Sequence, residues 1–212
     1  MATSIPAIAC LGVIGRNNNP LHTTLFPTTL DPSTGHHVPL RTPLQFSLLL
    51  SGTLDIFASR ARHASASGTL LSGDFGLLHA VDDRLAAYGW ETNTGVKLVA
   101  VVDMRGRSLD SLPGKAGPGA SSASASQKAS SSSSSSAAAT AAGVGLREGE
   151  LKVVFRAMQT AYVRLLQNPF YDPDEANELG AQGGVRRITS RKFAEEMRRI
   201  GDVWVPGSVV AL

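Results

Sequence analysis

The fold of this chain is decided by the stretch Val96-Lys97-Leu98-Val99-Ala100-Val101-Val102-Asp103. Nearly every position is apolar and several are β-branched, which predicts a strand with both of its faces covered. Such a strand lies in the middle of a sheet. Farther along, a helix at residues 151–166 is predicted by apolar residues that recur at helical spacing, namely Leu151, Val154, Phe155, Met158, Tyr162 and Leu165.

Four further strands are predicted around the central one. We expect them at residues 7–15, 21–26, 75–80 and 84–91. The last of these turns into the central strand through Thr92-Asn93-Thr94-Gly95, which has the residue types of a tight hairpin. The hairpin makes the neighbouring strands antiparallel.

Two further helices are predicted, one between the second and third strands of the sequence and one after the helix at residues 151–166. The first would begin near Thr53, a residue type that caps helices, and Asp55 would lie in its first turn. There the helix dipole favours a negative charge by about 0.5 kcal/mol. Its apolar face would carry Leu50, Leu54, Phe57 and Ala61. The last helix is expected at residues 190–200, with Phe193, Met197 and Ile200 on one face.

The order of elements is therefore strand, strand, helix, three strands, helix, helix. It predicts an α+β protein: a five-stranded antiparallel sheet with helices on both faces. We expect residues 1–212 to form a single domain with two inserted loops. Residues 27–43 are rich in proline and lack periodicity. Residues 107–145 contain an unbroken serine run and too few apolar residues to order themselves, which predicts a disordered loop.

Composition excludes several classes of function. The net charge of +3 is too diffuse for a nucleic-acid-binding protein, whose positive charge gathers on one face. No apolar run approaches the roughly 20 residues of a membrane helix, so any membrane contact would be peripheral. No Lys or Arg precedes the apolar residues 5–14, which favours a buried first strand over a signal peptide. The single cysteine fits a reducing compartment.

No catalytic residue, metal site or cofactor site is predicted. The pair His36-His37 has no cysteine or carboxylate cluster near it in sequence, so we interpret it as a solvated loop pair. Cys10 lies between Ile8 and Leu11 in an apolar run. A nucleophilic cysteine needs exposure and a basic partner, so Cys10 is interpreted as a small buried residue.

The block Asn168-Pro169-Phe170-Tyr171 is similar to an endocytic sorting signal. Here it follows a helix directly, and proline ends helices. We therefore interpret it as a helix stop, with Phe170 and Tyr171 packed back on the domain.

Basic residues flank the apolar face of the last helix. They are Arg186, Arg187, Arg191, Lys192, Arg198 and Arg199. We interpret them as a solvated face. The alternative is a weak attraction to anionic lipid, of about 1 kcal/mol per residue near the surface.

Four blocks together carry a family resemblance. They are Val13-Ile14-Gly15-Arg16-Asn17-Asn18-Asn19-Pro20-Leu21; Ser51-Gly52-Thr53-Leu54-Asp55; Gly76-Leu77-Leu78 with Tyr88-Gly89-Trp90-Glu91-Thr92-Asn93; and residues 96–103 with Leu146-Arg147 and Asn168-Pro169-Phe170-Tyr171. In order and spacing they resemble the sedlin-like subunits of the TRAPP (transport protein particle) tethering complex. The chain departs from that pattern by its two insertions and by an extended tail after Asn177.

The resemblance implies a longin-like fold and a subunit without enzymatic activity of its own and without cofactors. Its partners would be other TRAPP subunits and, indirectly, a Rab GTPase. It would act in endoplasmic reticulum to Golgi and intra-Golgi transport, in the cytoplasm and at the periphery of both membranes. The resemblance also implies that Asp55 contacts a partner subunit. The alternative for Asp55 is the helix-dipole role described above.

Two other classes of function remain as alternatives. Another longin-type trafficking module could be a SNARE regulatory domain or an adaptor small chain. A SNARE would need a heptad segment and a membrane anchor, and an adaptor small chain lacks the Asn-Pro-Phe-Tyr block. An unrelated small enzyme would need convergent polar residues, and five scattered histidines with one cysteine assemble no such site.

Overall fold

The computed structural model describes residues 4–31, 33–67, 73–108, 146, 149–171 and 187–207. In these residues five strands form one antiparallel sheet, in the order β2-β1-β7-β6-β5. The strands are β1 (Ser4–Ile14), β2 (Pro20–Leu25), β5 (Asp74–Ala80), β6 (Leu85–Glu91) and β7 (Lys97–Ser108). The helices are α1 (Pro43–Ser67), α2 (Glu150–Leu166) and α3 (Arg191–Val203). The predicted α+β class and five-stranded antiparallel sheet are confirmed.

Strand β7 lies in the centre of the sheet, as its composition predicts. Its side chains alternate between two separate cores. Leu98, Ala100 and Val102 are fully buried in one core, and Val99 and Val101 are fully buried in the other. Neither face of this part of the strand contacts water, so apolar residues occupy consecutive positions and do not alternate with polar ones.

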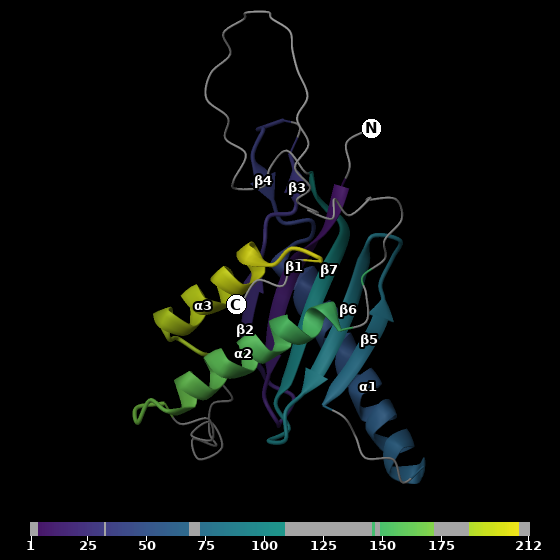
Figure 1. Cartoon of the computed structure of the whole chain (residues 1–212), viewed down its shortest axis with the longest axis vertical. Helices are drawn as coiled ribbons and strands as arrows, with labels where there is room; N and C mark the ends of the chain where they lie inside the picture. The colour runs from purple at the N-terminus through teal and green to yellow at the C-terminus, as the bar shows by residue number, and fades with distance from the viewer. Residues whose placement is uncertain are drawn as a thin grey trace, which may run out of the picture.

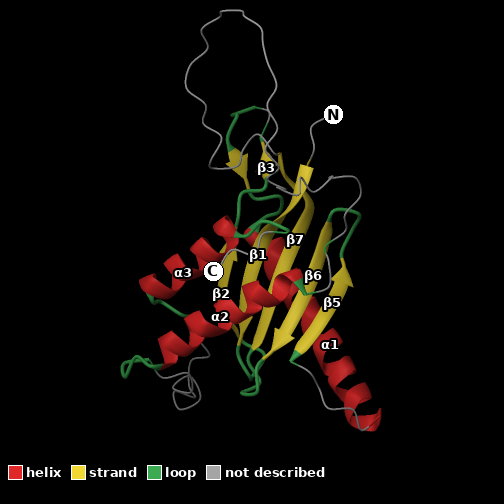
Figure 2. Ribbon diagram, viewed as in Figure 1, coloured by secondary structure: helices red, strands yellow, loops and turns green. Residues whose placement is uncertain are grey.

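Helices cover both faces of the sheet (Figures 1 and 2). Helices α2 and α3 lie side by side over one face, and α1 lies over the opposite face. The predicted stripe of α2 is buried in full, and the ring of Phe155 stacks on Trp90 with centroids 6.1 Å apart. In α3, Phe193, Met197 and Ile200 are buried as predicted. Burying each such side chain stabilises the fold by about 1.5–3 kcal/mol.

Helix α1 begins about ten residues before the predicted start, so the assignment of Thr53 as its cap was wrong. The start is marked by Thr42 and Gln45. The Gln45 N–H donates to the Thr42 hydroxyl over 3.3 Å, and the Thr42 N–H donates to the Gln45 side-chain oxygen over 3.0 Å. This reciprocal pair is a capping box. Pro43 follows the cap, where a missing N–H costs nothing.

Two glycines of the sheet let α1 approach closely. A Cβ atom on Gly12 would lie 2.7 Å from a methyl carbon of Leu50. A Cβ atom on Gly89 would lie 2.5 Å from the ring of Phe57. Both distances are too short for carbon atoms in contact, so a larger residue at either position would push α1 away from the sheet.

The proline-rich insertion contains two short strands. Strands β3 (Thr29–Leu30) and β4 (His37–Val38) pair with each other as a separate small sheet. The expected element order is thus extended by this hairpin, which the prolines did not indicate. The expected disordered loop at 107–145 lies outside the described residues, except that its first two residues belong to the end of β7.

Candidate interaction surface

Each edge strand of the five-stranded sheet accepts at least one hydrogen bond from another part of the chain. On β5, the side chain of Arg60 from α1 donates hydrogen bonds to the carbonyl oxygens of Phe75 and Leu77. On β2, the N–H of Ile188 donates to the carbonyl oxygen of Leu21 over 2.8 Å. Such bonds limit the pairing of an added strand at these positions.

The outward side of α1 is an exposed surface with an apolar and an acidic part. We call Leu44, Leu48, Gly52 and Asp55 the α1 outer surface. They follow one another at steps of three or four residues, so they lie in one row about 16 Å long. The side chains of Leu44 and Leu48 are 70% and 65% exposed, and a Cβ atom on Gly52 would meet nothing within 4 Å. Apolar residues spaced along one exposed helix face suit a docking contact.

Asp55 lies in the middle of α1 and not in its first turn. The proposed role in the helix dipole is therefore wrong, because that effect decays within one turn of the helix end. Its side chain is exposed, and no hydrogen bond or ion pair to it is found among the described residues. The helix-dipole explanation for this charge is therefore removed, and the contact with a partner subunit stays a prediction.

A buried ion pair was missed by the sequence analysis. The guanidinium of Arg84 donates to both carboxylate oxygens of Asp103, each over 2.7 Å, and Asp103 is fully buried. Arg84 also donates to the Thr29 hydroxyl over 3.0 Å, which links the β3–β4 hairpin to the sheet. These bonds to Asp103 raise the pKa of Arg84. Counting back from the hairpin at residues 92–95 places Leu85 opposite Asp103, so the register could have revealed the pair.

Cys10 is fully buried, and burial raises the pKa of its thiol far above the ordinary value. This confirms its interpretation as a small buried residue, because the reactive form of a cysteine is the thiolate. His36 and His37 lie exposed in the small hairpin. Among the described residues, no group of three or more His, Cys, Asp or Glu side chains is placed to hold a metal ion.

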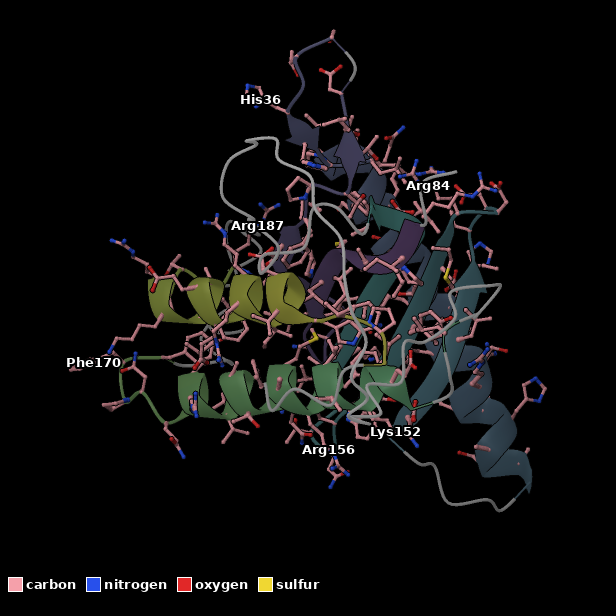
Figure 3. All side chains as sticks on the ribbon, turned by 45° about the horizontal axis from the view of Figure 1, so that its top comes forward. His36, Arg84, Lys152, Arg156, Phe170 and Arg187 are labelled. Atoms are coloured by element: carbon pink, nitrogen blue, oxygen red, sulfur yellow. The ribbon has the colours of Figure 1, made fainter. Side chains whose placement is uncertain are left out.

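The block at residues 168–171 ends α2, and its two aromatic residues behave differently. Tyr171 packs against the core that α2 and α3 cover. Phe170 is 91% exposed and points away from the molecule (Figure 3). The prediction that both rings pack on the domain was therefore wrong for Phe170. In this turn the Phe170 N–H donates to the side-chain oxygen of Asn168 over 3.2 Å.

The basic residues near α3 are exposed, apart from Arg186, which lies outside the described residues. Arg191 forms an ion pair with Glu195 within the helix, over 2.8 Å. Arg198 lies near His22 of β2, and burial together with this charge lowers the pKa of His22. The remaining ones, Arg187, Lys192 and Arg199, form no ion pair within the described part of the chain.

None of the helices in the described ranges has the length and apolar character needed to cross a membrane. The fold and the surfaces above define an α+β protein whose candidate site is an exposed helix surface. Comparison with known families then gives a more particular assignment. The family model described as sedlin matches residues 13–202.

Among curated proteins, similar chains are trafficking protein particle complex subunit 2-like proteins. The one from Dictyostelium discoideum is 22% identical over 195 residues, which cover 91% of this chain and 95% of the relative. The one from Bos taurus is 26% identical over 188 residues, which cover 87% and 89%. The one from Xenopus tropicalis is 25% identical over 170 residues, which cover 78% and 84%. The chain belongs to the sedlin family.

Proposed function

We propose that this chain is a non-catalytic subunit of a TRAPP-type vesicle-tethering complex. Two observations support the proposal. The chain belongs to the sedlin family, and the relatives that it matches over most of their length are named as subunits of the trafficking protein particle complex. The α1 outer surface then provides a place for a neighbouring subunit, since it is exposed and carries an acidic residue without a partner among the described residues.

Asp55 is the residue that we assign to this contact. In the proposed assembly, Leu44 and Leu48 supply apolar area and Asp55 pairs with a basic group of the neighbouring subunit. An exposed acidic residue at the edge of an apolar patch gives direction to docking, because only one orientation of the partner places a positive charge beside it. The fold does not depend on this side chain, since it is exposed.

The transport step and the location of the chain are proposed on the same grounds. The chain would work in endoplasmic reticulum to Golgi and intra-Golgi transport, at the cytoplasmic periphery of these membranes. It would support Rab activation through the complex and not through groups of its own. Exposed basic residues near α3, such as Arg187 and Lys192, would add a weak attraction to anionic lipid.

Co-purification from the native cell tests the assignment. Tagged wild-type chain should recover TRAPP subunits, and Asp55→Tyr should not, because a bulky ring replaces the charge at the contact. A steric clash together with a lost charge contact at an interface costs about 2 kcal/mol or more, which is roughly a thirtyfold loss of affinity. Asp55→Asn removes the charge alone and should give a smaller loss.

The matched control is Asp83→Tyr, the same change on the turn between β5 and β6, where the Asp83 side chain is 80% exposed. It should recover the subunits at the wild-type level. Circular dichroism should show an unchanged fold for both variants. Wild-type recovery by Asp55→Tyr would remove Asp55 from the interface. Absence of TRAPP subunits from the wild-type purification would overturn the proposed function itself.

A further inference from the structure

A groove lies between α2 and α3, on the side of the sheet opposite to α1. The two helices run side by side in opposite directions (Figures 1 and 3). The groove has a volume of about 280 Å³ and is lined by residues of both helices. We call it the α2/α3 groove and define it by Arg156, Ala157, Ala161, Arg164, Arg199 and Ile200.

The centre of the groove is lined by small apolar residues of α2 and by one apolar residue of α3. Ala157 and Ala161 follow each other by one helical turn on α2, and Ile200 closes the groove from α3. Val153 extends this apolar strip by another turn and is 40% exposed. Longer side chains at the two alanines would have filled the space between the helices. A large apolar side chain of another molecule therefore fits here.

The rim of the groove is basic. Arg156, Arg164 and Arg199 line it, and Glu196 is the one acidic residue among its lining residues. Glu196 is already paired with Arg164. Arg156 and Arg199 are exposed and have no ion pair within the described part of the chain. Two guanidinium groups on opposite helices thus face solvent beside an apolar strip.

We propose that the α2/α3 groove binds an acidic peptide segment of a partner protein, with an apolar side chain of the peptide against the two alanines and its carboxylates on Arg156 and Arg199. Charge complementarity carries this assignment. Arginine holds carboxylates in a two-pronged geometry, and its stem adds apolar contact. A concave strip between two helices also matches the way in which short segments bind helical grooves.

A membrane surface fits the groove less well. A bilayer is flat and is met by side chains that protrude, whereas the apolar residues here lie recessed between two helices. The groove is also separate from the α1 outer surface, because the sheet lies between them. The inference therefore goes beyond the assembly contact at Asp55 and can fail without affecting it.

Selection of peptides from a random phage-displayed library on the full chain tests the proposal. The enriched peptides should combine an excess of Asp and Glu with at least one large apolar residue. A labelled enriched peptide should then bind Arg156→Glu/Arg199→Glu at least about tenfold more weakly than the wild type. Arg156→Ala/Arg199→Ala should give a smaller loss in the same direction. Both arginines are exposed, so urea unfolding should show wild-type stability for each variant.

The matched control is Arg187→Glu, an exposed arginine before α3 that is not among the residues lining the groove. It should leave binding within about twofold of the wild type. The proposal is overturned if no peptide is enriched, if the enriched peptides lack acidic residues, or if Arg187→Glu weakens binding as much as the double variant. A second experiment measures the binding of the same chains to vesicles containing phosphatidylserine. If they bind through Arg156 and Arg199 while peptides do not, the groove binds lipid instead.

Discussion

Replacing Arg84 by methionine would leave the carboxylate of Asp103 buried without its charged partner. Asp103 is fully buried, whereas the side chain of Arg84 is 27% exposed. After the substitution, the bond from the Arg105 N–H, at 3.0 Å, is the one that remains to Asp103 among those described. Removing one partner of a buried ion pair typically costs about 3–5 kcal/mol. For a chain of this size, we expect the melting temperature to fall by about 6 to 20 °C.

The reverse substitution should be milder, because the two partners are buried to different extents. In Asp103→Leu the guanidinium of Arg84 keeps access to water, so we expect a loss of about 1–3 kcal/mol. The double variant Arg84→Met/Asp103→Leu removes both charges, and an apolar pair often replaces a buried ion pair without loss. It should therefore be more stable than Arg84→Met alone by about 2 kcal/mol or more.

Urea unfolding followed by circular dichroism measures all four chains of this cycle. The slopes of the transitions should agree, so that differences in midpoint report stability. If Arg84→Met lowers the free energy of unfolding by less than about 1 kcal/mol, the guanidinium of Arg84 does not stabilise the buried carboxylate of Asp103. If the losses of the two single variants simply add in the double variant, the two side chains do not interact, and the reasoning fails.

Four further predictions concern the core, the long insertion and two titratable groups. Phe155→Ala should destabilise the chain by about 3–5 kcal/mol in urea unfolding, because it leaves a cavity under α2; a loss below about 1 kcal/mol would contradict the burial. Replacing residues 109–145 by a short Gly/Ser link should leave the melting temperature nearly unchanged, since loop length costs only about 0.6 kcal/mol per doubling. A fall of more than about 10 °C would mean that this segment is packed. Burial lowers the pKa of His22, with the charge of Arg198 adding to it, so the unfolded chain binds a proton at a higher pH than the folded one. Stability should therefore fall as the pH drops below about 6.5, and His22→Gln, unlike the exposed control His79→Gln, should weaken this dependence in urea midpoints. Cys10 should react with a thiol reagent only in urea, because burial raises the pKa of its thiol; rapid labelling of the native chain would show that β1 opens.

The candidate interaction surface was predicted in part. The resemblance singled out Asp55, and the structure shows it exposed, although not at the helix start that the sequence indicated. The start was misplaced because Thr53 is also a capping residue type. In the folded chain it lies inside α1, and its hydroxyl donates to the carbonyl oxygen of Leu50 over 2.6 Å. Only the position of α1 on the sheet shows that Leu44 and Leu48 face outward.

The sequence by itself determined the elements whose signal is local and periodic. A run of apolar residues from Leu98 to Val102 is most stable in the middle of a sheet that is covered on both faces. The stripe of α2 likewise buries as the helical period requires. The apolar faces of these elements are buried in any compact arrangement, because removing apolar area from water is favourable wherever the elements pack.

The tertiary structure alone decided which polar groups meet. Arg84 reaches Asp103 because the strands β6 and β7 pair in one register, and it reaches Thr29 because the insertion folds back over that end of the sheet. Arg156 and Arg199 line one groove because α2 and α3 lie side by side. Such contacts carry no periodic signal in the sequence. A charged residue can lie on the surface of many different folds with a similar free energy. The residue that it contacts therefore depends on how distant segments pack together.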